Sequence, residues 1–218
     1  MKTDTLSEIV YKELKQRILS GEYQPGERLL IEKISNKLEV SMTPLKDAFR
    51  LLEQEGLVTN IPRKGTFVTK LSDQDVLEYC MIRLSLESLG VDTICSRDVA
   101  PLPGQIKDLE DLNKKVELAL KKQNKRDFII YDIKFHKEIA ALSGNNKLVE
   151  MLSMYPLNNF LVLMGGGILN TQDITETVSQ HSKIIDALQK KDAVAAKQLL
   201  KENILILHQN LIRANEEI

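Results

Sequence analysis

Two histidines, an aspartate and an asparagine have the residue types and spacing to bind one divalent cation. Asp132 and His136 are four residues apart in an apolar helical pattern, so both side chains project from one face of the helix. His181 precedes residues 190–192, and Asn203 follows them at a nearly equal distance along the chain. If residues 190–192 form the turn of a helical hairpin, these two side chains reach the same height, each roughly 15 Å from the turn at ~1.5 Å per residue. All four would then converge in the core of a bundle.

Three interpretations of this cluster stay open. In the first, the four side chains hold a divalent metal. In the second, each is a lone polar group that is satisfied by hydrogen bonds or lies at the surface, and an isolated Asp-His pair would favour this one. In the third, Asp132, His136 and His181 leave an open position on the ion and form a metal-dependent hydrolase. No further general base is identifiable by motif, which disfavours the hydrolase.

Arg83 is the candidate for binding an anion. An arginine fork inside a helical cavity binds a carboxylate through two parallel hydrogen bonds. Glu87 is four residues further along the same predicted helix and could instead pair with Arg83 on the helix surface. The sequence does not decide between these two interpretations.

Helices must position these side chains. Residues 72–75 have the spacing of a capping box and open a predicted helix that runs to about residue 98. Two prolines and a glycine then interrupt the pattern. Helical periodicity resumes over residues 105–122, 127–142, 148–164, 171–190 and 193–214. Six helices without a strand signal predict an all-α bundle over residues 71–218.

Residues 1–70 show a different pattern, which predicts a separate domain of three helices and a β-hairpin. Apolar residues recur at helical spacing over residues 6–18, 30–38 and 45–52, and Ser41 can cap the third of these helices. Two β-prone runs within residues 57–69 flank a basic tip, which predicts the hairpin. The fold class is therefore mainly α, with a winged helix-turn-helix before the bundle.

A winged helix-turn-helix makes double-stranded DNA the expected partner. In this motif the second helix of the helix-turn-helix, here the one that contains residues 45–52, enters the major groove with its N-terminal residues toward base edges. The basic wing suits phosphates or the minor groove. The candidate DNA-binding residues are Ser41, Met42, Thr43, Lys46 and Arg50 in the helix and Arg63, Lys64 and Gly65 in the wing.

Composition agrees with a regulator without requiring one. The chain has 218 residues, 43% of them hydrophobic, which is enough for one large or two modest domains. The formal net charge of −1 does not by itself indicate a nucleic-acid binder, so the local placement of basic residues carries that argument. No apolar run reaches the roughly 20 residues that span a bilayer, and the first residues do not resemble a signal peptide. We therefore expect a cytoplasmic protein with no membrane partner, in which Cys80 and Cys95 are buried thiols.

Residues 25–68 resemble the DNA-binding domain of the GntR family of bacterial transcription regulators. The resemblance rests on PGERL at 25–29, VS-x-TP at 40–44, LE-x-EGLV at 52–58 and G-x-FV at 65–68. Met42 departs from the family because an arginine usually stands there, and Lys46 stands where arginine is common. Arginine can bind guanine O6 and N7 together, whereas methionine has no donor and lysine is a point charge. Glu39 stands where glycine is usual in the turn, and a left-handed conformation would strain it.

Residues 71–215 resemble the FCD ligand-binding domain of the FadR subgroup within this family. The shared features are the Asp-x-x-x-His pair, FH at 135–136, SGN at 143–145 and H-x-x-I-x-x-AL at 181–188. In that domain the Asp-His pair and two further histidines often hold a divalent metal beside the effector cavity. The resemblance thus implies a zinc, nickel or manganese site that is weakened because Asn203 replaces the last histidine; an amide oxygen binds zinc less well than imidazole does but suits harder ions.

Together these features predict an effector-responsive transcription regulator, not an enzyme. The family's effectors are often carboxylates, which implies that Arg83 binds the effector. The expected mechanism is that of a repressor: a homodimer places two recognition helices in successive major grooves of an operator, and effector binding shifts their orientation. A metal-sensing regulator is the main alternative. A metal-dependent hydrolase would leave the winged helix unexplained.

Overall fold

The computed structural model describes residues 4–98, 100–153 and 171–216, which form two compact units. One unit contains the described residues up to Leu71, and the other contains those from Ser72 onward. Among the described helices, none is both long enough and apolar enough to cross a membrane.

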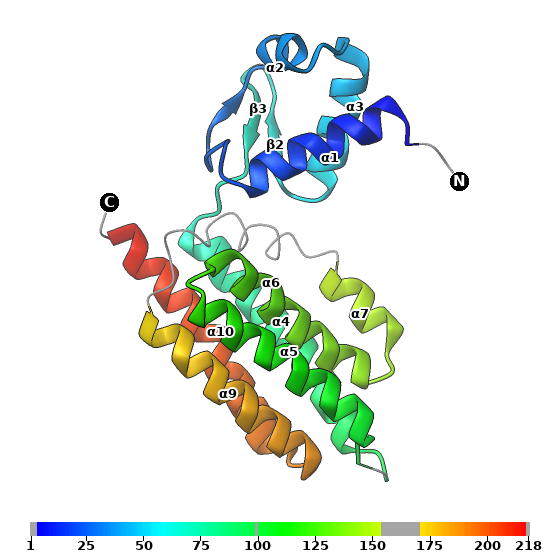
Figure 1. Ribbon diagram of the computed structural model, residues 1–218, viewed down its shortest axis with the longest axis vertical. Helices are drawn as coiled ribbons and strands as arrows, with labels where there is room; N and C mark the ends of the chain where they lie inside the picture. The colour runs from blue at the N-terminus through cyan, green and yellow to red at the C-terminus, as the bar shows by residue number, and fades with distance from the viewer. Residues whose placement is uncertain (1–3, 99, 154–170, 217–218) are drawn as a thin grey trace. The chain divides into compact units, whose positions relative to one another are not determined.

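The N-terminal unit contains the predicted three helices and hairpin, with one short strand in addition (Figure 1). Its elements are α1 (Leu6–Leu19), β1 (Arg28–Leu29), α2 (Ile31–Leu38), α3 (Met42–Gln54), β2 (Val58–Ile61) and β3 (Gly65–Val68). The strands form an antiparallel sheet in the order β1-β3-β2, with Arg28 opposite Phe67 and Val58 opposite Val68. The strand β1 was not predicted because two residues are too few to show a period.

The core of this unit lies where α1 and α3 meet the inner face of the hairpin. Its apolar side chains include Leu14 and Ile18 of α1 and Leu45 and Leu52 of α3, none of which is exposed to solvent. Their spacing of four residues in α1 and seven residues in α3 places them on one face of each helix, as the sequence predicts. The packed core therefore fixes the orientation of α3, whose opposite face is polar and exposed.

The turn between α2 and α3 holds Glu39 in the left-handed conformation, with φ 54° and ψ 37°. A side chain with a Cβ pays roughly 1–2 kcal/mol for this conformation, and glycine does not. Ser41 occupies the cap position of α3, but its side chain accepts no hydrogen bond from the first helical turn. The predicted capping role of Ser41 is therefore wrong.

Replacing Glu39 with glycine is expected to raise the free energy of unfolding of the N-terminal unit by about 0.5–1 kcal/mol. Glycine relieves the backbone strain at this position, and its larger conformational entropy in the unfolded chain offsets part of the gain. Urea unfolding followed by circular dichroism measures this change. Asn36→Gly in α2 is the matched control and should lower the same free energy by a similar amount. If both variants are destabilised alike, Glu39 is not strained in the folded protein.

The C-terminal unit is an all-helical bundle, as predicted (Figure 1). Its helices are α4 (Asp73–Cys95), α5 (Pro103–Lys121), α6 (Lys125–Leu142), α7 (Asn146–Ser153), α9 (Thr171–Gln189) and α10 (Ala193–Glu216). Ser72 and Asp75 form the predicted capping box at the start of α4. That helix ends at Cys95, earlier than predicted, and the predicted continuation of α7 to residue 164 lies outside the described residues.

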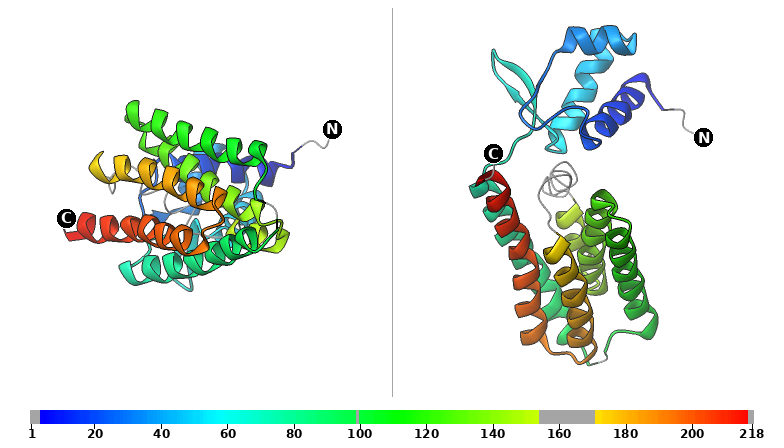
Figure 2. Two further views of the ribbon diagram at one scale, coloured as in Figure 1. Left: turned by 90° about the horizontal axis from the view of Figure 1, so that it is seen from below. Right: turned by 60° about the vertical axis from the view of Figure 1, so that its left-hand side comes forward.

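One apolar core is shared by the long helices of the bundle, which lie side by side in both views of Figure 2. Its fully buried members include Val91 of α4, Leu109 of α5, Phe135 of α6 and Leu188 of α9. Of the two cysteines, Cys80 is buried as expected, and Cys95 is only partly buried.

The helices α9 and α10 form the predicted antiparallel hairpin. The turn falls at residues 190–192, where Lys191 has a positive φ of 57° and Asp192 accepts a hydrogen bond from the amide of Ala195 in the first turn of α10. His181 and Asn203 therefore lie at matching heights on neighbouring helices, and both are buried.

Candidate functional site

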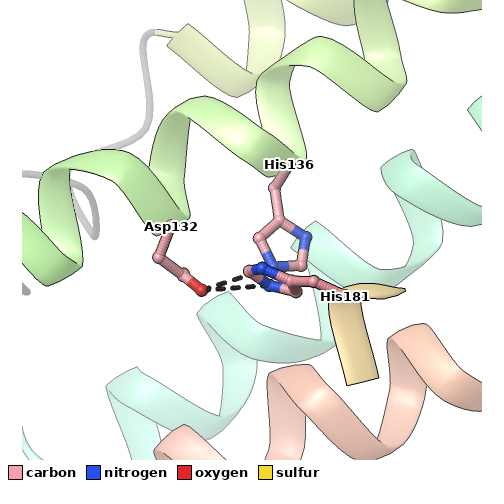
Figure 3. Close-up of side chains that lie close together, drawn as sticks. All are labelled: Asp132, His136 and His181. Carbon is pink, nitrogen blue, oxygen red and sulfur yellow. Dashed lines mark ion pairs between the residues drawn. The ribbon is translucent and has the colours of Figure 1, made fainter. Parts of the chain in front are cut away.

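The four candidate metal ligands come together in the bundle core. Asp132 and His136 lie one turn apart on α6 and face His181 of α9, as Figure 3 shows. Asp132 Oδ1 is 3.3 Å from His181 Nε2 and 3.8 Å from His136 Nε2. Asn203 of α10 completes the group, with its Oδ1 atom 2.9 Å from His136 Nε2. The sequence therefore located all four side chains of this cluster.

His136 contacts Glu87 through one ring nitrogen, Nδ1, and faces Asn203 with the other, Nε2. Its Nδ1 atom lies 2.6 Å from Glu87 Oε2. Burial raises the pKa of Glu87, but His136 and Arg83 lower that pKa by more, so the carboxylate stays ionised and Nδ1–H donates to it. In the neutral ring Nε2 is then an acceptor.

Asn203 faces this acceptor with another acceptor. The amide nitrogen of Asn203 donates to Gln180 Oε1 at 3.0 Å, so its oxygen is the atom that points at His136 Nε2. Two lone pairs 2.9 Å apart repel each other unless a proton or a metal ion lies between them. Exchanging the oxygen and nitrogen of both amides, so that Asn203 donates to His136, would be the remaining arrangement.

His181 repeats this pattern on the other side of the cluster. Asn113 donates through its amide nitrogen to Val178 O and Ser182 Oγ, so its oxygen accepts from His181 Nδ1 at 3.2 Å. The Nε2 atom then directs a lone pair toward Asp132 Oδ1 and has no hydrogen-bond partner among the described residues. Burial lowers the pKa of His181 by more than Asp132 raises it, which favours the neutral ring.

The remaining contacts fix the ring of His181 in place and keep Asp132 ionised. The ring of Phe135 stacks on that of His181, with centroids 3.8 Å apart and planes 10° from parallel. Burial raises the pKa of Asp132, but His136, His181 and Arg83 together lower that pKa well below its usual range. Asp132 is therefore a carboxylate at neutral pH. Two imidazole nitrogens, one carboxylate oxygen and one amide oxygen are thus grouped around one position, and the residues present fit a divalent cation.

Arg83 pairs with Glu87, as in one of the two alternatives that the sequence left open, but the pair is buried in the bundle and does not lie on a helix surface. Only 5% of Arg83 is exposed, and Glu87 is not exposed at all. Arg83 Nε donates to Glu87 Oε1 at 2.6 Å. Its Nη2 atom is 3.9 Å from Asp132 Oδ2 and has no hydrogen-bond partner among the described residues. A buried guanidinium nitrogen with donors to spare lies beside the cluster, which suits an anion.

The residues that orient the ligands were not predicted. Asn113 and Gln180 match no motif in the sequence, and the spacing of Glu87 indicates only a partner for Arg83. Asn113 occupies a core-facing position of α5 between Leu109 and Val116. A polar residue in an apolar helical stripe was the signal that could have identified it.

The candidate DNA-binding residues lie at the cap and along the exposed face of α3 and at the tip of the wing. Ser41, Met42, Thr43, Lys46 and Arg50 are all exposed. In the wing, Arg63 and Lys64 are exposed, and Lys64 N donates to Ile61 O at 3.0 Å to close a tight turn. Arg63 occupies the left-handed position of that turn with φ 64°. Gly65 begins β3 with φ 107°, a conformation that side chains with a Cβ rarely adopt.

Comparison with known proteins supports both halves of this description. Residues 6–68 match the family model described as "Bacterial regulatory proteins, gntR family", and residues 78–205 match that of the FCD domain. The chain is 30% identical over 191 residues to the HTH-type transcriptional regulator YdhC of Bacillus subtilis (strain 168), covering 86% of this chain and 83% of YdhC. It is 25% identical over 196 residues to the gluconate operon transcriptional repressor of the same organism, covering 88% of this chain and 79% of the repressor.

The fold is shared with solved structures. A crystal structure of a GntR regulator from Rhodococcus sp. RHA1 superposes with a TM-score of 0.77 at 24% identity, covering 95% of this chain and 98% of the other. Proteins of this family are transcription regulators that bind DNA operators and not enzymes, which removes the hydrolase alternative, and FCD domains bind small-molecule effectors and can bind metal. The FCD match alone spans more than half of the sequence. The chain therefore belongs to the GntR family of bacterial transcription regulators and carries an FCD domain after its winged helix-turn-helix.

Proposed function

We propose that this protein is a repressor whose operator binding is controlled by a small carboxylate effector, bound beside one divalent cation in the helical bundle. The observation that carries the proposal is the set of lone pairs directed at one another by Asp132, His136, His181 and Asn203. The name of the gluconate operon repressor, a relative of this chain, supports the direction of regulation. A single recognition helix reads few base pairs, so the active form is a homodimer on two half-sites.

The donor set favours a metal that accepts oxygen ligands. The donor atoms are close enough to share one ion. His136 Nε2 is 2.9 Å from Asn203 Oδ1 and 3.8 Å from Asp132 Oδ1, and His181 Nε2 is 3.3 Å from Asp132 Oδ1. Two imidazole nitrogens and two oxygens suit manganese better than zinc, whose structural sites are tetrahedral and rich in sulfur and nitrogen.

The charges around the cluster explain why an anion would bind only with the metal present. Asp132 and Glu87 carry two negative charges, and Arg83 carries one positive charge. A divalent cation reverses the sign of this sum and becomes the largest local charge. A carboxylate between the ion and Arg83 Nη2 would then satisfy the guanidinium donor that has no hydrogen-bond partner in the described part of the chain.

Binding of the full-length protein to the DNA upstream of its own gene tests the proposal. Sequence-specific binding at physiological salt is expected, with an affinity that changes when a carboxylate is added to the manganese-loaded protein. Indifference to DNA sequence would contradict the regulatory role. An affinity that responds to manganese alone, without any carboxylate, would replace the carboxylate effector with the metal-sensing alternative.

The wing gives a prediction of its own. Arg63 keeps a long charged side chain in a conformation that favours glycine, so we infer that its charge serves DNA binding. Arg63→Gly should weaken binding to all DNA sequences alike and reduce the slope of log affinity against log salt by about 1. Fluorescence anisotropy over a salt series measures this slope. Arg63→Lys, which keeps the charge, is the control; an unchanged slope in Arg63→Gly would show that the wing tip does not touch a phosphate.

A further inference from the structure

Glu87 contacts both functional parts of the bundle site with one carboxylate. Its Oε1 atom accepts from Arg83 Nε, and its Oε2 atom accepts from His136 Nδ1, both at 2.6 Å. It is completely buried on α4 and is not one of the side chains that surround the candidate metal position. Both of its oxygens are occupied by donors, so its role is to orient other side chains.

We propose that Glu87 is a positioning residue that keeps the proton of His136 on Nδ1 and thereby presents the Nε2 lone pair to the metal. This inference rests on the metal site proposed above. A histidine can carry its proton on either nitrogen, and the partner of one nitrogen decides what the other can do. A carboxylate can only accept, so it leaves Nδ1 no alternative to donation.

Glutamine at position 87 would reverse this choice without leaving a hole. Its amide has one accepting oxygen and one donating nitrogen. Arg83 Nε can only donate, so it takes the oxygen, and the amide nitrogen then faces His136 Nδ1, which must accept. The proton of His136 moves to Nε2 and is donated to Asn203 Oδ1, 2.9 Å away. The contact between His136 and Asn203 is thus satisfied without a metal in Glu87→Gln, and the Nε2 lone pair that would bind the metal is lost.

Titration of the metal-free, full-length protein with Mn²⁺ by calorimetry tests the proposal. Glu87→Gln is expected to weaken Mn²⁺ binding at least about 10–100-fold, the range seen when outer partners of metal ligands are removed. Glu78→Gln is the matched control, because Glu78 lies exposed on the same helix and loses the same charge. Its affinity for Mn²⁺ should equal that of the unaltered protein.

A second measurement separates positioning from a general effect on the fold or on charge. Nitrogen-15 NMR of the metal-free protein should find the His136 proton on Nδ1, and on Nε2 in Glu87→Gln. Adding Arg83→Met to Glu87→Gln removes the donor that claims the amide oxygen, so the glutamine can turn this oxygen to Nδ1–H and recover most of the Mn²⁺ affinity.

Three outcomes would overturn the proposal. The first is Mn²⁺ binding by Glu87→Gln at the affinity of the unaltered protein. The second is loss of binding with the proton still on Nδ1, which would make the effect one of charge alone. The third is failure of the unaltered protein to bind Mn²⁺ while its His136 proton is on Nδ1, which would refute the proposed metal site and not the hydrogen bond to Glu87.

Discussion

Asn203→His is expected to raise the affinity of the metal-free protein for Zn²⁺ by at least about 10–100-fold, the change that outer partners of metal ligands alone produce. Asn203 lies beside His136 with its oxygen toward the cluster, so an imidazole there would supply a third nitrogen donor. Zinc prefers nitrogen to an amide oxygen, and a set of one carboxylate and three imidazoles suits it. Competition with a chromogenic chelator measures the affinity.

The same variant should change selectivity, which a control can isolate. Asn203→His is expected to favour Zn²⁺ over Mn²⁺ more strongly than the natural sequence does. Asn203→Ala removes the ligand and leaves His136 Nε2 without this neighbour, so it should weaken the binding of both Zn²⁺ and Mn²⁺. Equal Zn²⁺ affinities for the natural protein and Asn203→His would show that residue 203 does not face the ion.

Met42→Arg is expected to create a preference for guanine at one position of each operator half-site, worth roughly 1–3 kcal/mol if the guanidinium binds O6 and N7 together. Met42 is the first residue of α3, and 43% of it is exposed, so a longer side chain can extend from this position without disturbing the core. Selection of binding sites from random DNA, with sequencing of the bound pool, measures the preference.

The control for this variant is Met42→Leu, which changes the shape of the side chain but adds no hydrogen-bond donor. It should leave the selected sequence unchanged. If Met42→Arg also selects the original sequence, residue 42 lies away from the base edges, and the docking of α3 assumed here is wrong.

Elements with a strong period and clear caps were predictable from the sequence. The capping box at Ser72 and the turn at residues 190–192 set helix ends that the structure confirms, and the second of these aligned His181 with Asn203. Local sequence decides such features because each depends on residues within one or two turns. The strand β1 was not predictable because its two residues show no period and its partner β3 is distant in sequence.

The burial of the Arg83–Glu87 pair was not predictable for a specific physical reason. A spacing of four residues is the same on a buried face and on an exposed face. The apolar pattern of α4 does not mark the buried face, because Met81, Ile82 and Leu89 of this helix are half exposed. The orienting contacts of Asn113 and Gln180 depend on the register between helices, which no local pattern encodes.

Anomalous diffraction from crystals of the full-length protein grown with Mn²⁺ can locate the ion in the bundle. We expect one peak in each chain, bonded at about 2.0–2.2 Å to Asp132 Oδ1, His136 Nε2, His181 Nε2 and Asn203 Oδ1. The contradicting result is no peak at this position, with the amides of Asn203 and Gln180 exchanged so that Asn203 donates to His136. In that case hydrogen bonds alone would satisfy the cluster, and the bundle would not use a metal to bind its effector.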